Sequence, residues 1–338
     1  MRWDDVNARA RGLATHLLDR GTLAGLAAAP GWPAFISRVS SLGYSLSGAA
    51  MADPAAFDRA VSLVASRRLN LLGRWLSTRG AVLAVVLEDE ERRTVRALLR
   101  GAAQGASPGA RLRAVMPTPQ LPVSRLERLA HASSVPELVE DLVRAGHPAG
   151  RALQDVLRHA KVPNLQALEW ALARLFSERA TRSARPGGPV VRGFAAELVD
   201  QENVWTLLLS APPEAGGLVD QAFLPGGTRL TRKEFARLRT ERDSQRLVQE
   251  LRVLFKGTPL GAALAVDPLD MPVLPLRAAA TRIAWFHGLS RRDPLSPAVV
   301  LGVMERVRAE ARALRTIAWG VSFGAPASTV MVLIPEAA

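Results

Sequence analysis

One short string in the sequence could supply a catalytic nucleophile. Residues 320–324 read GVSFG, which matches the G-x-S-x-G pattern with Ser322 in the nucleophile position. That pattern needs a strand before the serine and a helix after it, whereas here a helical periodicity precedes it and Pro326 follows. A pattern with three fixed positions also arises easily by chance. We therefore expect Ser322 to lie at a helix end and turn, not in an active site.

The other residues that could do chemistry form no recognisable set. The sequence has no cysteine, no phosphate-binding glycine loop and no H-E-x-x-H motif. No histidine pairs with another histidine or with a suitable acid cluster at helical ligand spacing; the five are His16, His131, His147, His159 and His287. The acidic run 88–91 is followed at once by Arg92 and Arg93, which favours a charge-balanced helix start over a cation site. We predict a protein that is not an enzyme, with no catalytic, cofactor-binding or metal-binding residues.

The charge of the chain restricts its partners. The net charge is +13 and is carried almost entirely by arginine, because the only lysines are Lys161, Lys233 and Lys256. Such a balance favours an acidic protein face, nucleic acid or anionic lipid, and is also typical of solvated arginine-rich helices. Basic residues cluster at 92–113 and 179–192. An arginine-rich helical nucleic-acid-binding protein is therefore the alternative function, although the first cluster contains no aromatic residue to stack on a base.

Two segments of the sequence bear on membrane targeting. The first twelve residues have no apolar core and are not typical of a secretory signal. Residues 316–335 carry no charge over a length that could span a membrane, but Gly320, Gly324 and Pro326 interrupt them. We expect a packed C-terminal segment, and no transmembrane helix.

Helix is the only periodicity that the chain sustains, and one helical pattern opens three segments. Two apolar residues three apart are followed nine residues later by a third, and then by a glycine with a turn-type or aromatic neighbour. The sets are Leu23, Leu26, Phe35 and Gly43-Tyr44; Leu126, Leu129, Leu138 and Gly146-His147; and Phe235, Leu238, Leu247 and Gly257-Thr258. This spacing predicts a helix, a short turn, a second helix and a glycine stop.

A second pattern closes each segment. The strings are ERRTVRALLRG (91–101), DQENVWTLLLS (200–210) and EARALRTIAWG (310–320). Each string begins with an acid, has apolar residues four and seven positions after it, and ends with a small residue ten positions after it. The acids are Glu91, Asp200 and Glu310, and the small residues are Gly101, Ser210 and Gly320. We interpret the acids as helix-start residues that meet the helix dipole, and the small residues as helix stops.

Both patterns share a period near 110 residues, which predicts an all-α chain of three tandem similar helical domains. The proline- and glycine-rich stretches 105–122 and 211–217 are expected to link them, and 182–193 is expected to be a loop inside the second domain. The predicted domains are 1–105, 106–215 and 216–338.

Several strings resemble, in the correct order, the C subunit (eukaryotic d) of V-type and archaeal-type rotary ATPases. They are RARGLATHLL (9–18), residues 69–105, MPTPQL followed by LERLA, AGHPAGRAL (145–153), VDQENVWTLLL (199–209), FLPGGTRLTRKEF (223–235), GTPLGAAL (257–264) and, as the strongest match, residues 291–320. The sequence departs from the family pattern where Thr94 and Ala313 stand in the column of Asn203, and at Asp293, where an asparagine is common.

The resemblance implies a pseudo-threefold funnel of three helical domains on the cytoplasmic face of the membrane. A protein of this family is a non-catalytic rotor subunit that couples the D/F-type central stalk to the proteolipid ring for proton or sodium transport. It would be a peripheral, monomeric component of a hetero-oligomeric complex, with no cofactor, small-molecule substrate or nucleic acid. Arg96, Arg100 and Arg315, on the closing helices of the first and third repeats, are then the candidates for partner contacts.

Overall fold

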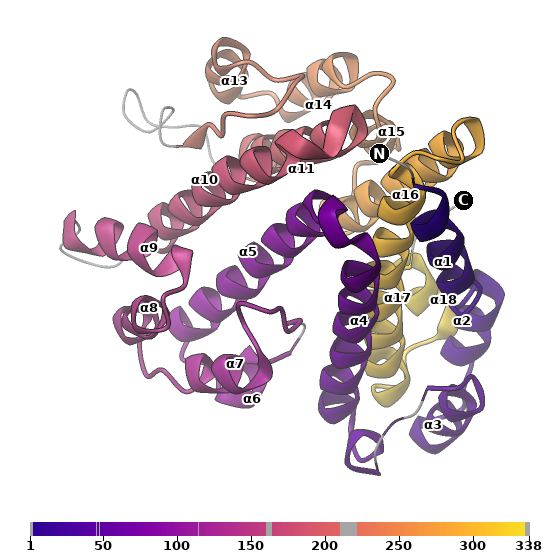
Figure 1. Ribbon diagram of the computed structural model, residues 1–338. Helices are drawn as coiled ribbons and strands as arrows, with labels where there is room; N and C mark the ends of the chain where they lie inside the picture. Colours follow the sequence, from indigo (N-terminus) through magenta and orange to yellow (C-terminus); the bar gives the residue numbers. More distant parts are fainter. Residues whose placement is uncertain are drawn as a thin grey trace. The chain divides into compact units, whose positions relative to one another are not determined.

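The computed structural model describes residues 3–44, 46, 48–113, 115–159, 164–209 and 222–334, and every regular element in these ranges is helical (Figure 1). The all-α prediction is therefore confirmed. The helices of the N-terminal part are α1 (Asp4–Ala14), α2 (Arg20–Ala27), α3 (Trp32–Ser41), η1 (Gly48–Met51), α4 (Pro54–Leu76), η2 (Ser77–Arg79) and α5 (Ala81–Ala103). The middle part contains α6 (Pro108–Arg111), α7 (Val123–Ala130), α8 (Val135–Arg144), α9 (Pro148–His159), α10 (Leu165–Ala184), η3 (Arg185–Gly187) and α11 (Gly188–Leu209). The C-terminal part contains α13 (Arg232–Arg239), α14 (Ser244–Leu254), α15 (Pro259–Leu264), α16 (Leu274–Arg292), α17 (Ala298–Ser322) and α18 (Ala327–Val332).

The chain divides into two compact units. The first contains residues 1–77, 108–126 and 271–338, and the second contains 78–107 and 127–270. The first unit thus brings the two ends of the sequence together. The division of the sequence into three tandem domains remains a prediction.

The first unit is built around α17. This 25-residue helix packs against α1, α4 and α16, and Figure 1 shows α4 and α17 side by side. Val300, Met304 and Leu314 of α17 are fully buried among these neighbours. The N-terminus of α4 is fixed by Asp53, whose carboxylate accepts the Ala56 N–H at 2.7 Å, with a proline in the first turn.

The second unit is centred on α5, α10 and α11. Helix α10 packs against both of the others, and α8 and α9 form an adjoining pair. Asn164 caps α10 by accepting the Ala167 N–H, and Thr231 begins α13 with a complete capping box to Glu234. Local sequence signals therefore fix where these two helices begin.

The glycine stops of the opening pattern lie where the spacing predicts them. Gly43, Gly146 and Gly257 follow α3, α8 and α14 and have positive φ angles of 80°, 67° and 77°. A glycine is favoured there because a Cβ is strained in the left-handed region.

The loop expected at 182–193 is wrong in extent. Helix α10 continues to Ala184, and α11 begins at Gly188 after the single turn η3. The chain changes direction at Gly188, which has a φ of 81°. The prolines and glycines here therefore form a sharp corner between two long helices. Of the predicted linkers, 105–122 contains the short helix α6, and 211–217 lies outside the described residues.

The uncharged C-terminal stretch is divided between two helices. Gly324, with a φ of 67°, and Pro326 separate the end of α17 from α18. Among the helices that the structure describes, none is both long enough and apolar enough to cross a membrane.

Candidate functional site: acidic clasps and the arginine network

The three acids of the closing pattern do not begin helices, so that interpretation is wrong. Glu91, Asp200 and Glu310 lie in the interiors of α5, α11 and α17, and all three are buried. The apolar run before each acid belongs to the same helix, so the acids are too far from the N-terminus to meet its dipole. A carboxylate in this position needs a specific partner, because burial without one is costly.

The small residues of the same pattern are also inside their helices. Gly101 and Gly320 accept the N–H groups of Ala106 and Ala325 through their carbonyls, both at 2.9 Å. The chain reverses instead at Gly105 and Gly324, which have positive φ. The carbonyls of Gly101 and Gly320 are therefore the acceptors in Schellman-type helix ends. The helix stops themselves lie four residues later, at Gly105 and Gly324. Ser210 lies outside the described residues.

Glu310 holds the opening segment of the chain to α17. Its carboxylate accepts hydrogen bonds from the Leu18 N–H, the Tyr44 hydroxyl and the Arg68 guanidinium. Arg68 also donates to the Tyr44 hydroxyl at 3.1 Å. Burial, reinforced by the negative charge of Glu310, raises the pKa of Tyr44 well above its ordinary value, so the hydroxyl remains a donor.

Asp200 makes the corresponding contact in the second unit. Its carboxylate accepts the N–H groups of Thr228, Arg229 and Leu230 at 2.9, 3.0 and 3.3 Å. Burial raises the pKa of Asp200, and these three donors limit the rise. Gly227 is required for the approach, because a Cβ at that position would lie 2.1 Å from the Asp200 Oδ1 atom.

Asn203, one turn further along α11, is hydrogen-bonded to the same segment at Leu224. Its amide donates to the Leu224 carbonyl at 2.9 Å and accepts the Leu224 N–H at 2.8 Å. The D-x-x-N string of α11 and the FLPGGTRL string at 223–230 are thus the two halves of one buried contact. Thr94 and Ala313, which occupy the same column in the other repeats, cannot reproduce this paired amide contact.

Glu91 faces the opening segment of the second repeat. Its Oε2 atom lies 3.6 Å from the His147 Nε2 atom, and both side chains are buried. The His147 Nδ1 atom accepts the Ala149 N–H at 3.2 Å, and Nε2 is the ring nitrogen that faces Glu91. His147 is therefore part of a turn at the start of α9, as the sequence predicts.

The three acids follow one rule. We call these contacts the acidic clasps: Glu91 with His147, Asp200 with residues 228–230, and Glu310 with Leu18 and Tyr44. In each clasp, the closing helix of one repeat contacts the opening segment of the next, and the third repeat contacts the first. Leu18 and Leu230 even occupy equivalent positions, five residues before Leu23 and Phe235. The acid of each closing string therefore contacts the opening segment of another repeat, which the sequence pattern alone does not show.

Arg96 and Arg100, two of the predicted partner-contact residues, belong to an ion-pair network within the second unit. Arg96 contacts Glu202 at 2.8 Å, and Arg100 makes a bidentate pair with Glu169 at 2.5 and 2.8 Å. The Arg100 side chain is 54% exposed and that of Arg96 is 21% exposed. Arg100 is thus the candidate with a guanidinium still open to a partner.

Glu202 is the centre of this network. Arg92 contacts it at 2.7 Å in addition to Arg96, and Arg92 also pairs with the fully buried Asp89 at 2.6 Å. Burial alone would raise the pKa of Glu202, but the two guanidiniums lower it to about 2. The acidic run at 88–91, expected to be a solvated helix start, instead lies mid-helix and helps to join α5 to its neighbours; Glu88, for example, pairs with Arg179 of α10 at 2.6 Å.

Arg315, the third predicted partner-contact residue, lies in the first unit. It donates to the Ser62 hydroxyl at 3.2 Å and lies 3.8 Å from the Asp58 carboxylate, so it joins α17 to α4. On the same helix, Glu305 accepts from Arg282 of α16 at 3.0 Å and from Arg308 at 2.5 Å, with all three side chains at most 2% exposed. Within each unit, ion pairs therefore join the long helices.

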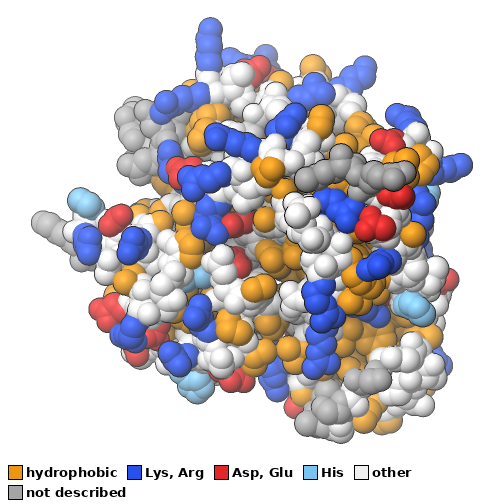
Figure 2. All heavy atoms as spheres, in the orientation of Figure 1, with side chains coloured by type: hydrophobic (Ala, Val, Ile, Leu, Met, Phe, Trp, Pro, Cys, Tyr) orange, Lys and Arg blue, Asp and Glu red, His pale blue; other side chains and the backbone are white. Residues whose placement is uncertain are grey.

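The structure gives no support to the residues considered for catalysis. Ser322 is the last residue of α17, and its hydroxyl donates to the Trp319 carbonyl at 3.0 Å; no strand precedes it. Within the described residues, no group of three or more acids and histidines could hold a metal ion. Figure 2 shows basic side chains distributed over the visible face among acidic and apolar ones.

The fold and its charged residues define an all-helical protein in which buried acids and arginines join the protein's own helices. Comparison with family models identifies its family. Residues 6–332 match the family described as ATP synthase (C/AC39) subunit, and the protein belongs to this family of V/A-type rotary ATPase subunits. A search among curated proteins finds no match.

Sequence reasoning missed the clasp partners and most of the network. Tyr44 and His147 were found as turn residues of the repeat, but not as partners of the acids. Glu202, Glu169 and Glu305 were not singled out at all, although each lies on a helix face that also carries buried apolar residues. An acid on the apolar face of an amphipathic helix is the signal that could have indicated them.

Proposed function

We propose that this protein is the non-catalytic rotor subunit that couples the central stalk of a V/A-type ATPase to its membrane ring. On this proposal its partners are D/F-type stalk subunits and the proteolipid ring, and it is a peripheral subunit on the cytoplasmic side. The three repeats, 1–105, 106–215 and 216–338, would form a pseudo-threefold funnel.

The observation that carries this proposal is the cyclic order of the acidic clasps. The first repeat contacts the second, the second contacts the third, and the third contacts the first. In this order each repeat is clasped to two others, so no repeat is terminal. That arrangement is suited to a rotor, because torque applied to one repeat is passed to both of its partners.

A rotor subunit must also resist shear between its helices, and buried ion pairs provide this resistance. Arg282, Glu305 and Arg308 join α16 to α17, while Arg92, Arg96 and Glu202 join α5 to α11. Hydrogen-bonded charges in a low-dielectric interior have a narrow range of acceptable geometry, so sliding one helix past another breaks several contacts together.

Arg100 is the residue that we propose for a stalk contact, and Arg96 and Arg315 are further candidates whose side chains are less exposed. Arg100→Glu would repel both Glu169 and an acidic partner, whereas Arg100→Gln removes only the positive charge. We expect Arg100→Glu to reduce ATP-driven ion pumping by the reconstituted complex more than it reduces ATP hydrolysis. A control, Arg144→Glu, changes an exposed helix charge whose pairs are local, at i−3 and i−4. Equal pumping per ATP in the Arg100→Glu complex and the unchanged complex would contradict this role of Arg100.

A further inference from the structure

A large cavity lies within the first unit, bordered by α16, α17 and the segment that joins α1 to α2. Its volume is about 860 Å³, and it is partly open to solvent. Apolar side chains form most of its wall; they include Leu17, Leu23, Ile283, Phe286, Val299 and Val303. This volume is in the range of cavities that hold small organic ligands.

The charged residues of the cavity are predominantly basic. Five arginines line it, namely Arg11, Arg20, Arg291, Arg306 and Arg312, against the two acids Asp19 and Glu310. Both acids already have partners: Asp19 accepts the Thr22 N–H as the cap of α2, and Glu310 forms its clasp. Among the described residues that line the cavity, basic side chains therefore outnumber acidic ones, beside an apolar wall.

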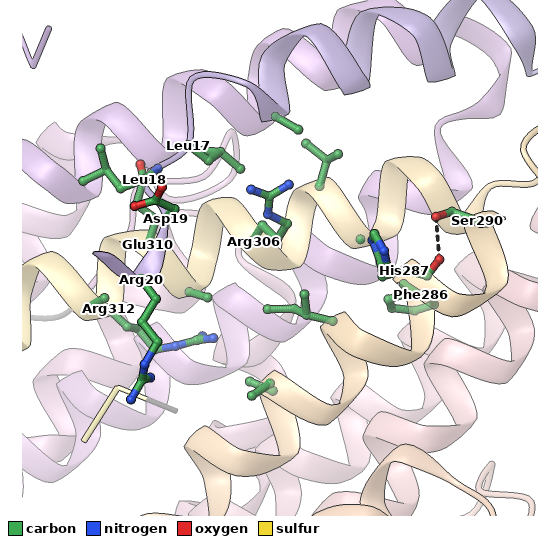
Figure 3. Close-up of a pocket in the computed structure, with 18 of the residues that line it drawn as sticks. Leu17, Leu18, Asp19, Arg20, Phe286, His287, Ser290, Arg306, Glu310 and Arg312 are labelled. Atoms are coloured by element: carbon green, nitrogen blue, oxygen red, sulfur yellow. Dashed lines mark hydrogen bonds between the residues drawn. The ribbon is translucent and has the colours of Figure 1, made fainter. Parts of the chain in front are cut away.

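Arg306 is the most informative of these residues. It projects from the middle of α17 and is half-buried, and no hydrogen bond or ion pair joins it to another residue that the structure describes. Figure 3 shows Arg306 between the group formed by Leu18, Asp19 and Glu310 on one side and His287 and Phe286 on the other. A guanidinium held against an apolar wall without a carboxylate is suited to an anion brought by a ligand.

The repeats provide an independent comparison. Arg306 lies four residues before Glu310, and the corresponding positions before Glu91 and Asp200 are Leu87 and Ala196. The packing of a closing helix therefore accepts an apolar residue in this column, and the arginine is particular to the third repeat. Helix packing alone therefore does not require an arginine at position 306.

We propose that the cavity binds a single-chain anionic amphiphile, with its carboxylate or phosphate on Arg306 and its hydrocarbon chain along the apolar faces of α16 and α17. Both parts of the site are needed, since the wall gives affinity for the chain and Arg306 fixes the head group. A partner helix is the less favoured occupant, because three turns of a helix about 10 Å wide fill on the order of 1,200 Å³. The proposal rests on the fold of the first unit and not on the proposed function.

Titration calorimetry on the purified full-length protein tests the proposal. The probes are decanoate, dodecanoate and tetradecanoate below their micelle concentrations, with dodecyl phosphate and the uncharged dodecanol as head-group controls. We expect one site per chain, an affinity gain of about fourfold for each CH₂ added, and much weaker binding of dodecanol. The ratio of the dodecanoate and dodecyl phosphate affinities distinguishes a fatty-acid ligand from a phosphate-headed lipid.

Three variants locate the site. Arg306→Leu, which installs the residue of the first repeat, is expected to weaken dodecanoate binding roughly tenfold to a hundredfold, and Arg306→Lys should restore part of it. Ala309→Trp places a large ring at a half-buried position on the cavity wall and should block binding while keeping the arginine. Arg67→Leu, on an exposed face of α4 outside the cavity, is the matched control and should bind as the unchanged protein does.

The opposite results are equally specific. Equal affinity for dodecanoate and dodecanol, or unchanged dodecanoate binding by Arg306→Leu, would overturn the proposal. Photo-crosslinking from position 309 in the intact membrane complex provides a second readout. A crosslink to another subunit, with no amphiphile binding by the isolated protein, would assign the cavity to a protein segment and overturn the proposal as well.

Discussion

Replacing Asp200 by alanine should loosen the segment 222–231, because this carboxylate accepts three successive backbone N–H groups. Those of Thr228, Arg229 and Leu230 donate to it at 2.9 to 3.3 Å, and the Leu230 contact is buried. The alanine variant provides no acceptor in their place. The N–H groups would then either remain without a partner or move towards solvent, while the two hydrogen bonds between Asn203 and Leu224 would remain.

The expected cost follows from the number and kind of bonds. Each hydrogen bond to a charged group contributes about 1.5 kcal/mol or more, so three contribute roughly 5 kcal/mol. Removing the carboxylate also removes the free-energy cost of burying it. The same burial raises the pKa of Asp200. We therefore expect a net loss of about 3 kcal/mol of local stability, which corresponds to roughly a hundredfold faster opening of the segment.

Hydrogen exchange measured by mass spectrometry tests this locally, at the amides of residues 228–230. Gly227→Ala should have a similar effect, because its Cβ would displace the Asp200 Oδ1 atom, whereas Gly12→Ala has nothing within 4 Å of its Cβ and should not. Asp243→Ala removes an exposed carboxylate cap and should accelerate exchange only near Gln245 and Arg246. Unchanged exchange at 228–230 in Asp200→Ala, with faster exchange in Asp243→Ala, would show that the Asp200 carboxylate does not stabilise this segment.

Three further predictions concern the buried charges. The folded pKa of Glu202 is about 2, below its unfolded value of 4.5, so its stabilisation is present above pH 4.5 and is lost as the pH falls towards 2. Acid unfolding followed by circular dichroism should be less steep in Glu202→Gln, with about 3 kcal/mol of pH-dependent stability missing. Glu305→Ala, which leaves Arg282 and Arg308 buried, should cost about 3–5 kcal/mol in urea unfolding, and a loss below 1 kcal/mol would contradict the account. Tyr44→Phe removes one donor to Glu310 and should cost about 1 kcal/mol in the same assay, with an unchanged midpoint as the contrary result.

The local elements could be predicted from the sequence because they depend on neighbours in the chain. Gly43, Gly146 and Gly257 end helices as predicted, since a left-handed residue after an apolar helix face is a local requirement. The all-α class and the family could be predicted for the same reason: helical periodicity and the order of the motifs are properties of the linear sequence.

The roles of the buried charges could not be predicted in this way. Glu91, Asp200 and Glu310 look like helix-start acids when only the following residues are considered, yet their partners lie in another repeat. The partner of Glu310 is 266 residues away at Tyr44, and no spacing rule connects them. Arg96 and Arg100 likewise resemble surface arginines until α10 and α11 place Glu169 and Glu202 beside them.

The association of this protein with other subunits tests the central proposal most directly. The full-length protein would be tagged in its native host, released from membranes with mild detergent, and purified with whatever remains bound. We expect recovery of rotary ATPase stalk and proteolipid subunits at fixed stoichiometry, with less stalk subunit in the Arg100→Glu variant. Recovery apart from any ATPase subunit, bound instead to nuclease-sensitive nucleic acid in a salt-dependent manner, would contradict it.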